Sequence, residues 1–285
     1  MTLVQKVEAG QKIDLSQIDA GTTAGLEKKA AVERLAALGE ELAHLQQLLY
    51  AAGTHSVLVV LQGMDTSGKD GVIRHVFTHM NPEGCHVESF KAPTADELAH
   101  DFLWRVHRAT PGRGNVTVFN RSHYEDVLIA RVHNLVPREV WQERYAQIND
   151  FEKLLLANKT IVLKFFLHIS KDEQEKRLLA REQEIEKAWK LSPADWQERN
   201  YWDDYQAAYK VVLEQCSTQA APWLIVPANK KWFRNIAVAE AIVEALRPFE
   251  GDWTSYLSKQ SKLRVEELKR YRAGLKKSQK TNVKK

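Results

Sequence analysis

The chain has 285 residues, a formal net charge of +4 and a hydrophobic content of 44%, which suffices for one large α/β domain with a full core. No apolar run approaches the ~20 residues that a membrane-spanning helix needs, and the first 19 residues lack the apolar core of a signal peptide. We therefore expect a cytoplasmic protein without a membrane partner. Cys85 and Cys216 have no Cys or His at metal-ligand spacing, which predicts reduced thiols.

The first 52 residues predict an arm and one amphipathic helix. Residues 1–20 mix apolar and charged side chains without a period, which indicates an arm over the surface. From about Thr23 to Ala52, leucines recur at heptad-like spacing and form one stripe. The stripe comprises Leu35, Leu38, Leu42, Leu45 and Leu49. Such a stripe usually packs on its own domain, and a subunit contact is the alternative.

The stretch that organises the chain is an apolar strand, 57–61, followed by a glycine-flanked loop and an apolar helical repeat. The spacing Gly63-x4-Gly68-Lys69 is the Walker A pattern, in which loop amides and the positive end of the next helix bind phosphate. Asp70 replaces the usual Ser or Thr, and Asp65 adds a second acid. Metal ions or basic groups must offset these two carboxylates before the loop can bind a phosphate chain.

Further strands and helices alternate along the rest of the chain. We expect strands at about 86–90, 116–119, 161–167 and 223–226, and helices at about 95–108, 138–157, 192–212 and 237–246. Five strands alternating with helices predict a mostly parallel, doubly wound sheet. This kinase-like domain would span residues 53–250, and a basic tail would follow at 251–285.

The strand at 116–119 should deliver a polar segment to the carboxyl edge of the sheet, where ligands bind in such folds. Within reach of that edge, Glu125 and Asp126 could join Asp65 in binding one or two Mg²⁺ ions, with Mn²⁺ as a substitute. Arg121, and Arg131 on the following helix, would supply positive charge for phosphoryl transfer. An ordinary surface ion pair of Arg121 with a nearby acid is the alternative.

The segment 170–198 is densely charged, and Arg177 and Arg181 lie four residues apart on one helical face. If this segment closes over the cleft, it is a lid that excludes water and brings cations to the transition state. Otherwise it is a solvated helix, which spacing alone favours.

The last 32 residues carry eleven Lys or Arg against two acids, so the rest of the chain is net negative. This tail would either bind a polyanion or keep the C-terminus soluble, and the sequence slightly favours the second role.

Five motifs in the same order resemble the polyphosphate kinase 2 family over roughly residues 50–250. The motifs span 63–71, 81–82, 90–94, 119–128 and 189–196. The resemblance implies a thymidylate-kinase-like P-loop fold, a three-layer α/β sandwich with about five parallel strands and a helical lid. It also implies Mg²⁺-dependent phosphate transfer between inorganic polyphosphate and nucleotides, by a homo-oligomer, either a tetramer or a dimer.

By this resemblance, Asp65 matches the metal-binding and catalytic acid of the loop, Lys69 the Walker lysine and Arg121 the Walker B arginine. Arg177 and Arg181 would be lid cations.

The Walker B segment departs from the family's commoner form, Asp-Arg-Ser-Trp-Tyr-Asn. Asn120 stands at the acid, His123 at the Trp and Glu125 at the Asn. This variant is similar to the class III enzymes, which phosphorylate both nucleoside monophosphates and diphosphates.

We therefore predict a kinase that uses polyphosphate to convert AMP to ADP and ADP to ATP. Guanine nucleotides are a second class of acceptor, and no nucleic-acid partner is expected. The predicted catalytic residues are Asp65, Lys69, Arg121, Glu125, Asp126, Arg177 and Arg181, and the predicted metal ligands are Asp65, Glu125 and Asp126. The predicted phosphate- and nucleotide-binding residues are Gly63, Met64, Thr66, Ser67, Gly68, Asp70, Gly71, Arg74, Lys91 and Arg131.

An ATP-dependent kinase of a nucleoside or small metabolite on the same fold is the main alternative. A non-catalytic protein that only binds polyanions or nucleotides ranks last, because the acids near the loop would be superfluous for that role.

Overall fold

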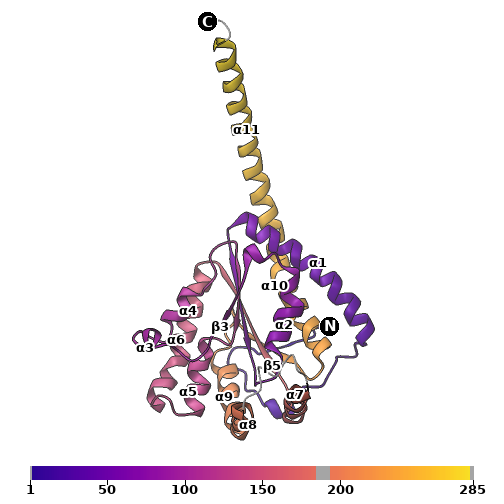
Figure 1. Ribbon diagram of the computed structural model, residues 1–285, viewed down its shortest axis with the longest axis vertical. Coiled ribbons are helices and arrows are strands. Elements are labelled where there is room, and N and C mark those ends of the chain that lie inside the picture. Colours follow the sequence, from indigo (N-terminus) through magenta and orange to yellow (C-terminus); the bar gives the residue numbers. More distant parts are fainter. Residues whose placement is uncertain (1, 184–192, 283–285) are drawn as a thin grey trace.

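The computed structural model describes residues 2–183 and 193–282, with side chains up to Gly274. Its centre is a six-stranded sheet of order β1-β6-β5-β2-β4-β3 (Figure 1). The strands are β1 (Gln5–Lys6), β2 (Ser56–Gln62), β3 (Cys85–Ser89), β4 (Val116–Asn120), β5 (Thr160–His168) and β6 (Trp223–Pro227). From β2 to β6 all pairings are parallel, which confirms the predicted α/β sheet of five parallel strands.

Helices cover both faces of this sheet (Figure 1). One face packs against α1 (Lys28–Ala52), α2 (Lys69–Val76) and α10 (Lys231–Leu246). The other face packs against α4 (Trp104–Arg108), α5 (Ile129–Val132), α6 (Arg138–Ala157) and α9 (Trp202–Gln215). Every residue of β2 is buried, because both of its faces are covered.

The leucine stripe of α1 packs on the chain's own core, against α10. Leu42, Leu45 and Leu49 are fully buried there, Leu38 is nearly so, and Leu35 is partly buried against the same cluster. The stripe therefore stabilises its own domain, which is the first of the two roles predicted from the sequence.

Three stretches differ from the sequence expectations. The single helix expected over 95–108 is wrong, because α3 (Ala95–Leu98) ends before α4 begins. Between them the Asp101 carboxylate accepts a hydrogen bond from the backbone N–H of Leu103 at 2.9 Å, and such a local bond competes with helix continuation.

The helix expected over 192–212 is also divided. A 3-10 turn at Arg199–Tyr201 separates α8 (Pro193–Glu198) from α9.

The third difference is the arm, which is more than a surface segment. Its strand β1 pairs antiparallel with the edge strand β6. Leu3 and Val7, on either side of β1, are buried in the two core clusters that line opposite faces of the sheet.

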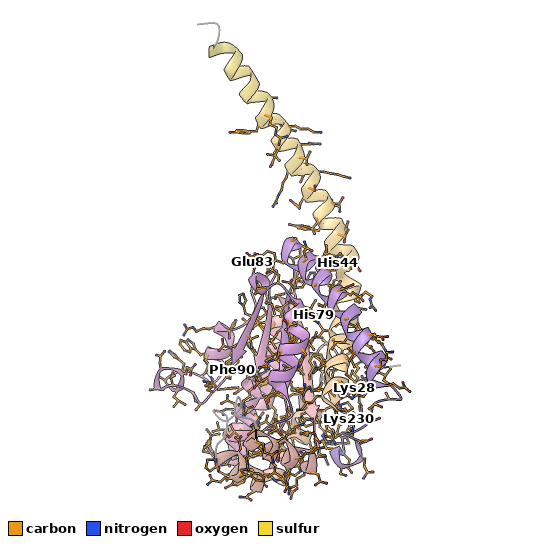
Figure 2. The ribbon with its side chains drawn as sticks, turned by 45° about the vertical axis from the view of Figure 1, so that its right-hand side comes forward. Lys28, His44, His79, Glu83, Phe90 and Lys230 are labelled. Atoms are coloured by element: carbon orange, nitrogen blue, oxygen red, sulfur yellow. The ribbon has the colours of Figure 1, made fainter. Side chains whose placement is uncertain are left out.

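The C-terminal region forms α11 (Glu250–Asn282), which leaves the body as a single long helix (Figures 1 and 2). Trp253 is buried and stacks on Phe249, so the first turn is anchored. Farther along, Leu263, Leu268 and Tyr271 are exposed. Among the described helices, none combines the length and apolar character that crossing a bilayer requires.

Candidate active site

The glycine-flanked loop lies at the carboxyl end of β2 and leads into α2. Gly63 and Gly68 have φ angles of +150° and +103°, which other residues rarely adopt. A Cβ on Gly63 would lie 2.7 Å from the Leu167 carbonyl oxygen, so the loop is packed tightly onto β5. The Thr66 and Ser67 hydroxyls are buried, and neither has a hydrogen-bond partner among the described residues. Donors without partners suit a loop that receives a polar ligand.

The Lys69 side chain folds back over this loop. Its Nζ donates to the carbonyl oxygens of Gly63 at 2.8 Å and Met64 at 3.3 Å. Burial lowers the pKa of Lys69 to about 8, the neighbouring Arg121 lowers it further, and nearby carboxylates oppose the shift. A poorly solvated ammonium ion at the loop is well placed to interact strongly with phosphate.

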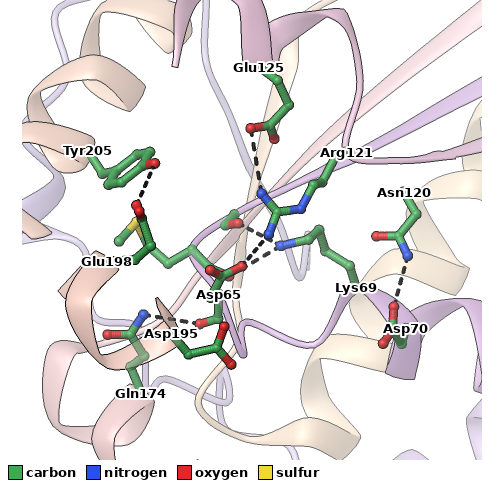
Figure 3. Close-up of polar contacts among 12 residues, drawn as sticks. Asp65, Lys69, Asp70, Asn120, Arg121, Glu125, Gln174, Asp195, Glu198 and Tyr205 are labelled. Atoms are coloured by element: carbon green, nitrogen blue, oxygen red, sulfur yellow. Dashed lines mark hydrogen bonds and ion pairs between the residues drawn. The ribbon is translucent and has the colours of Figure 1, made fainter. Parts of the chain in front are cut away.

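Arg121 joins two acids at the same edge of the sheet (Figure 3). Its guanidinium lies 2.5 Å from Asp65 and 3.6 Å from Glu125, measured between nitrogen and carboxylate oxygen. Burial disfavours the charged guanidinium, yet Glu125 and Asp65 raise the pKa of Arg121 above its ordinary value. The pair with Asp65 crosses from the Walker B segment to the phosphate loop, so it is not an ordinary local surface pair.

Asp65 and Glu125 together provide a suitable donor set for Mg²⁺. Their carboxylates converge on one guanidinium, and Mg²⁺ prefers oxygen ligands. Within the described residues, no group of three or more His, Cys, Asp or Glu forms a metal cage. Mg²⁺ commonly uses one or two protein carboxylates and completes its shell with water and substrate phosphates.

Asp126 and Asp70 have other partners. The Asp126 carboxylate accepts from Arg144 at 3.1 Å, so the structure does not bring this predicted metal ligand to Asp65 and Glu125. The Asp70 carboxylate accepts from the Asn120 amide at 2.8 Å (Figure 3). Asn120, which stands where the commoner family motif has an acid, thus donates to the acid that follows the Walker lysine.

The predicted lid begins with α7 (Lys171–Gln183), and Arg177 on this helix does not face the cleft. Its guanidinium is buried and donates to the carbonyl oxygens of Thr66, Ser67, Ala228 and Asn229. The expectation of a mobile lid cation at Arg177 is therefore wrong in placement, since these four carbonyls fix it behind the phosphate loop.

Arg181 lies one turn farther on and forms an ion pair of 3.1 Å with Asp195 on α8 (Pro193–Glu198). Burial, followed by the nearby Asp65, raises the pKa of Asp195. Arg181 is therefore linked to the acidic cluster through Asp195. The sequence does not identify Asp195 as a site residue and shows it only as part of a family motif. Residues 189–192 of that motif lie outside the described residues.

Three predicted phosphate-binding residues are not brought to this cluster. Arg74 is exposed on α2, and Lys91 is exposed after β3. The Arg131 guanidinium lies 4.8 Å from the centre of the Trp141 ring and donates to the Tyr145 hydroxyl. Cation–π packing therefore directs Arg131 toward α6.

Several residues at the site were not predicted from the sequence. The Tyr209 hydroxyl accepts from the backbone N–H of Gly63 at 3.2 Å, and the Gln174 amide donates to the Asp65 carbonyl at 3.2 Å. The Arg234 guanidinium lies under the loop and donates to the Ser67 carbonyl at 3.3 Å. All three come from helices far along the chain, and no local motif identifies them.

Comparisons with known proteins identify the family of this chain. A family model described as Polyphosphate kinase 2 (PPK2) matches residues 25–251. An AMP/ADP-polyphosphate phosphotransferase of Meiothermus ruber is 51% identical over 243 residues, covering 85% of this chain and 91% of that protein. An ADP-polyphosphate phosphotransferase of Rhodopseudomonas palustris is 48% identical over 254 residues, covering 85% and 88%.

Among solved structures, the crystal structure of polyphosphate kinase 2 from Arthrobacter aurescens TC1 superposes with a TM-score of 0.82 at 44% identity. The match covers 87% of this chain and 93% of that one. The family model and the relatives match most of the chain, and the five motifs and the phosphate loop agree with them. This chain therefore belongs to the polyphosphate kinase 2 family.

Proposed function

We propose that this chain transfers phosphate from inorganic polyphosphate to AMP and to ADP, producing ADP and ATP. The relatives named as AMP/ADP- and ADP-polyphosphate phosphotransferases support the reaction. The observation that carries the proposal is the convergence of Lys69, Arg121 and two carboxylates at the phosphate loop. Phosphoryl transfer needs positioning and charge stabilisation more than covalent chemistry, and these residues provide both.

In the transfer step, an oxygen of the nucleotide's terminal phosphate attacks the terminal phosphorus of polyphosphate. The P–O–P bond to the rest of the chain breaks as the new bond forms, and the shortened polyphosphate leaves with the electron pair. The loop amides and Lys69 hold the donor's negative charge, while Arg121 exchanges its carboxylate partners for phosphate oxygens.

Asp65 and Glu125 are the residues that would hold Mg²⁺ in this reaction. When bound, the ion neutralises phosphate charge and orients the reacting groups.

We also propose that both AMP and ADP are acceptors, as in class III enzymes. The two relatives described above differ in their names on this point, since only the Meiothermus ruber protein is named for AMP as well as ADP. Support comes from Glu125, which stands where the commoner family motif has Asn and contacts Arg121. A carboxylate there changes the charge next to Arg121.

A homo-oligomer is proposed as the working assembly. The exposed apolar side chains of α11, such as Leu263 and Leu268, are available for contact with another copy. Light scattering coupled to size-exclusion chromatography measures this directly, and a monomer at micromolar concentration would contradict it.

The function is tested by supplying purified protein with AMP and either long-chain polyphosphate or ATP, with and without Mg²⁺. We expect ADP and then ATP with polyphosphate, and no turnover in EDTA. Formation of ADP from ATP plus AMP is scored separately as adenylate-kinase activity. Turnover that stops at ADP would refute the class III proposal, and inactivity with polyphosphate would favour the metabolite-kinase alternative.

A further inference from the structure

Arg234, on the first turns of α10, lies directly under the phosphate loop. It is 2% exposed, and its Nη1 donates to the Ser67 carbonyl oxygen at 3.3 Å. A Cβ on Gly68 would lie 1.7 Å from Nη1, and a Cβ on Gly71 would lie 2.6 Å from Nη2. Because Gly68 and Gly71 have no Cβ, the Arg234 guanidinium can pack directly against the backbone of the loop. The other side of that backbone faces the phosphate site.

This buried cation has no acidic partner in the part of the chain that the structure describes. Its other hydrogen bonds, from Nε and Nη2, both go to the neutral side-chain oxygen of Asn235 at 3.1 and 2.8 Å. The neighbouring charge that affects its pKa is a second cation, Arg177. Burial, with a further contribution from Arg177, lowers the pKa of Arg234 to about 10, so the guanidinium is still charged at neutral pH.

Fold stability does not explain such an arrangement. Removing a charge from water is costly unless an opposite charge or a full set of hydrogen bonds compensates it. Arg177 meets that condition through Glu173 and four carbonyl oxygens, whereas Arg234 has one weak carbonyl contact and one amide. A neutral side chain of the same length would fold at least as well at position 234.

We propose that the compensating anion is the substrate: Arg234 is a positioning residue whose buried charge strengthens phosphate binding through the loop from behind. This inference rests on the proposed function for the identity of the phosphate chain. A low-dielectric position makes this charge more effective than one on the surface.

The test uses Arg234→Met, which keeps the length and removes the charge. We expect the melting temperature of the ligand-free protein to stay unchanged or rise. The increase in melting temperature caused by tripolyphosphate should shrink, and kcat/KM for polyphosphate should fall about tenfold or more, mainly through KM. KM for AMP should change little. Arg234→Lys, which retains a charge, should restore part of the tripolyphosphate effect.

Two further variants separate this role from a structural one. Arg113→Met removes one positive charge from an exposed position at the opposite end of the sheet and should leave both quantities unchanged. Gly71→Ala should displace the guanidinium, so the single variant should weaken tripolyphosphate binding. In the double variant with Arg234→Met, it should weaken binding little further. Fully additive effects of the two changes would contradict the contact.

A lower melting temperature of ligand-free Arg234→Met with an undiminished tripolyphosphate effect would overturn the inference. So would a wild-type protein that tripolyphosphate, pyrophosphate and ATP all fail to stabilise. The thermal measurement requires no turnover. Stabilisation by these ligands without polyphosphate-driven ATP formation would therefore refute the proposed function alone.

Discussion

The two sides of the phosphate loop are built on opposite principles. On the front, Arg121 and Asp65 form a side-chain ion pair with about a third of each side chain exposed. On the back, Arg177 is buried and donates to two backbone carbonyls of the same loop, whereas the buried Arg234 has one weak contact there and, by the inference above, serves phosphate binding. Exposed side-chain pairs can exchange partners when a phosphate arrives, whereas buried contacts to carbonyls keep the loop in shape. The chain thus separates groups that respond to substrate from groups that prepare for it.

The largest effect should follow from Lys69→Ala. Lys69 is buried and bonds loop carbonyls, but its charge interacts with Arg121 and Asp65, so it acts with the front groups. We expect kcat to fall on the order of a thousandfold, about 4 kcal/mol, because one cation at the transferring phosphate is lost. The melting temperature should change little, since Lys69 bonds only two loop carbonyls. Steady-state kinetics and thermal unfolding measure the two effects. Near-normal turnover in this variant would contradict the proposed role.

Arg177→Met on the back should reverse this pattern. It leaves four carbonyl groups without their donor and Glu173 without its partner, so we expect a loss of about 3 kcal/mol in the free energy of unfolding. Chemical denaturation at neutral pH measures this. If the variant were as stable as the wild type but failed in catalysis, Arg177 would belong with the front groups after all.

The pH dependence sharpens the contrast, because only a front group should titrate near neutrality. The charged form of Lys69 predominates below its lowered pKa of about 8 and is lost above it. We therefore expect kcat/KM for polyphosphate to fall as pH rises through about 8, since this quantity reports the free enzyme. In Lys69→Arg, whose side chain stays protonated, residual activity should lack this decline. An unchanged profile in that variant would assign the titration to another group.

The smallest effect should come from deleting residues 258–285, which takes away most of α11. We expect turnover with short-chain polyphosphate to change little, because the described side chains beyond Leu257 are mostly exposed and none belongs to the active-site cluster. Loss of the proposed contact between copies should appear separately, as a smaller mass in light scattering. If the basic helix gathers long polyanions, KM for long-chain polyphosphate should rise a few-fold at low salt, and the difference should vanish at high salt. Equal KM values at low salt would leave α11 with no role in donor binding.

The spacing of residues along the sequence was enough to predict those parts of the fold whose structure depends on neighbouring residues. The apolar runs of β2 and β5 and the glycine spacing of the loop predict the sheet and its ligand-binding edge. They do not predict where a long side chain ends. Arg177 and Arg181 occupy one helical face in the sequence, yet one contacts the loop from behind and the other pairs with Asp195.

The same limit explains Asp126, Arg131 and Arg234. Proximity along the chain suggests that Asp126 joins Glu125, but Arg144 on α6 binds it instead. Arg131, on α5, has an aromatic partner on α6, Trp141. Nothing local marks Arg234, because its environment comes from a loop more than 160 residues earlier in the chain. Tertiary packing, not spacing, decides these positions.

The short pairing of β1 with β6 has a practical consequence for handling the protein. Without the arm, β6 would present an open edge containing Leu224 and Ile225, and unpaired edges recruit strands from other molecules. Gln5 and Lys6 are both exposed, so the arm ends the sheet with a polar, charged rim. Trimming or crowding the N-terminus should therefore promote aggregation during purification and storage, and an affinity tag is better placed at the C-terminus.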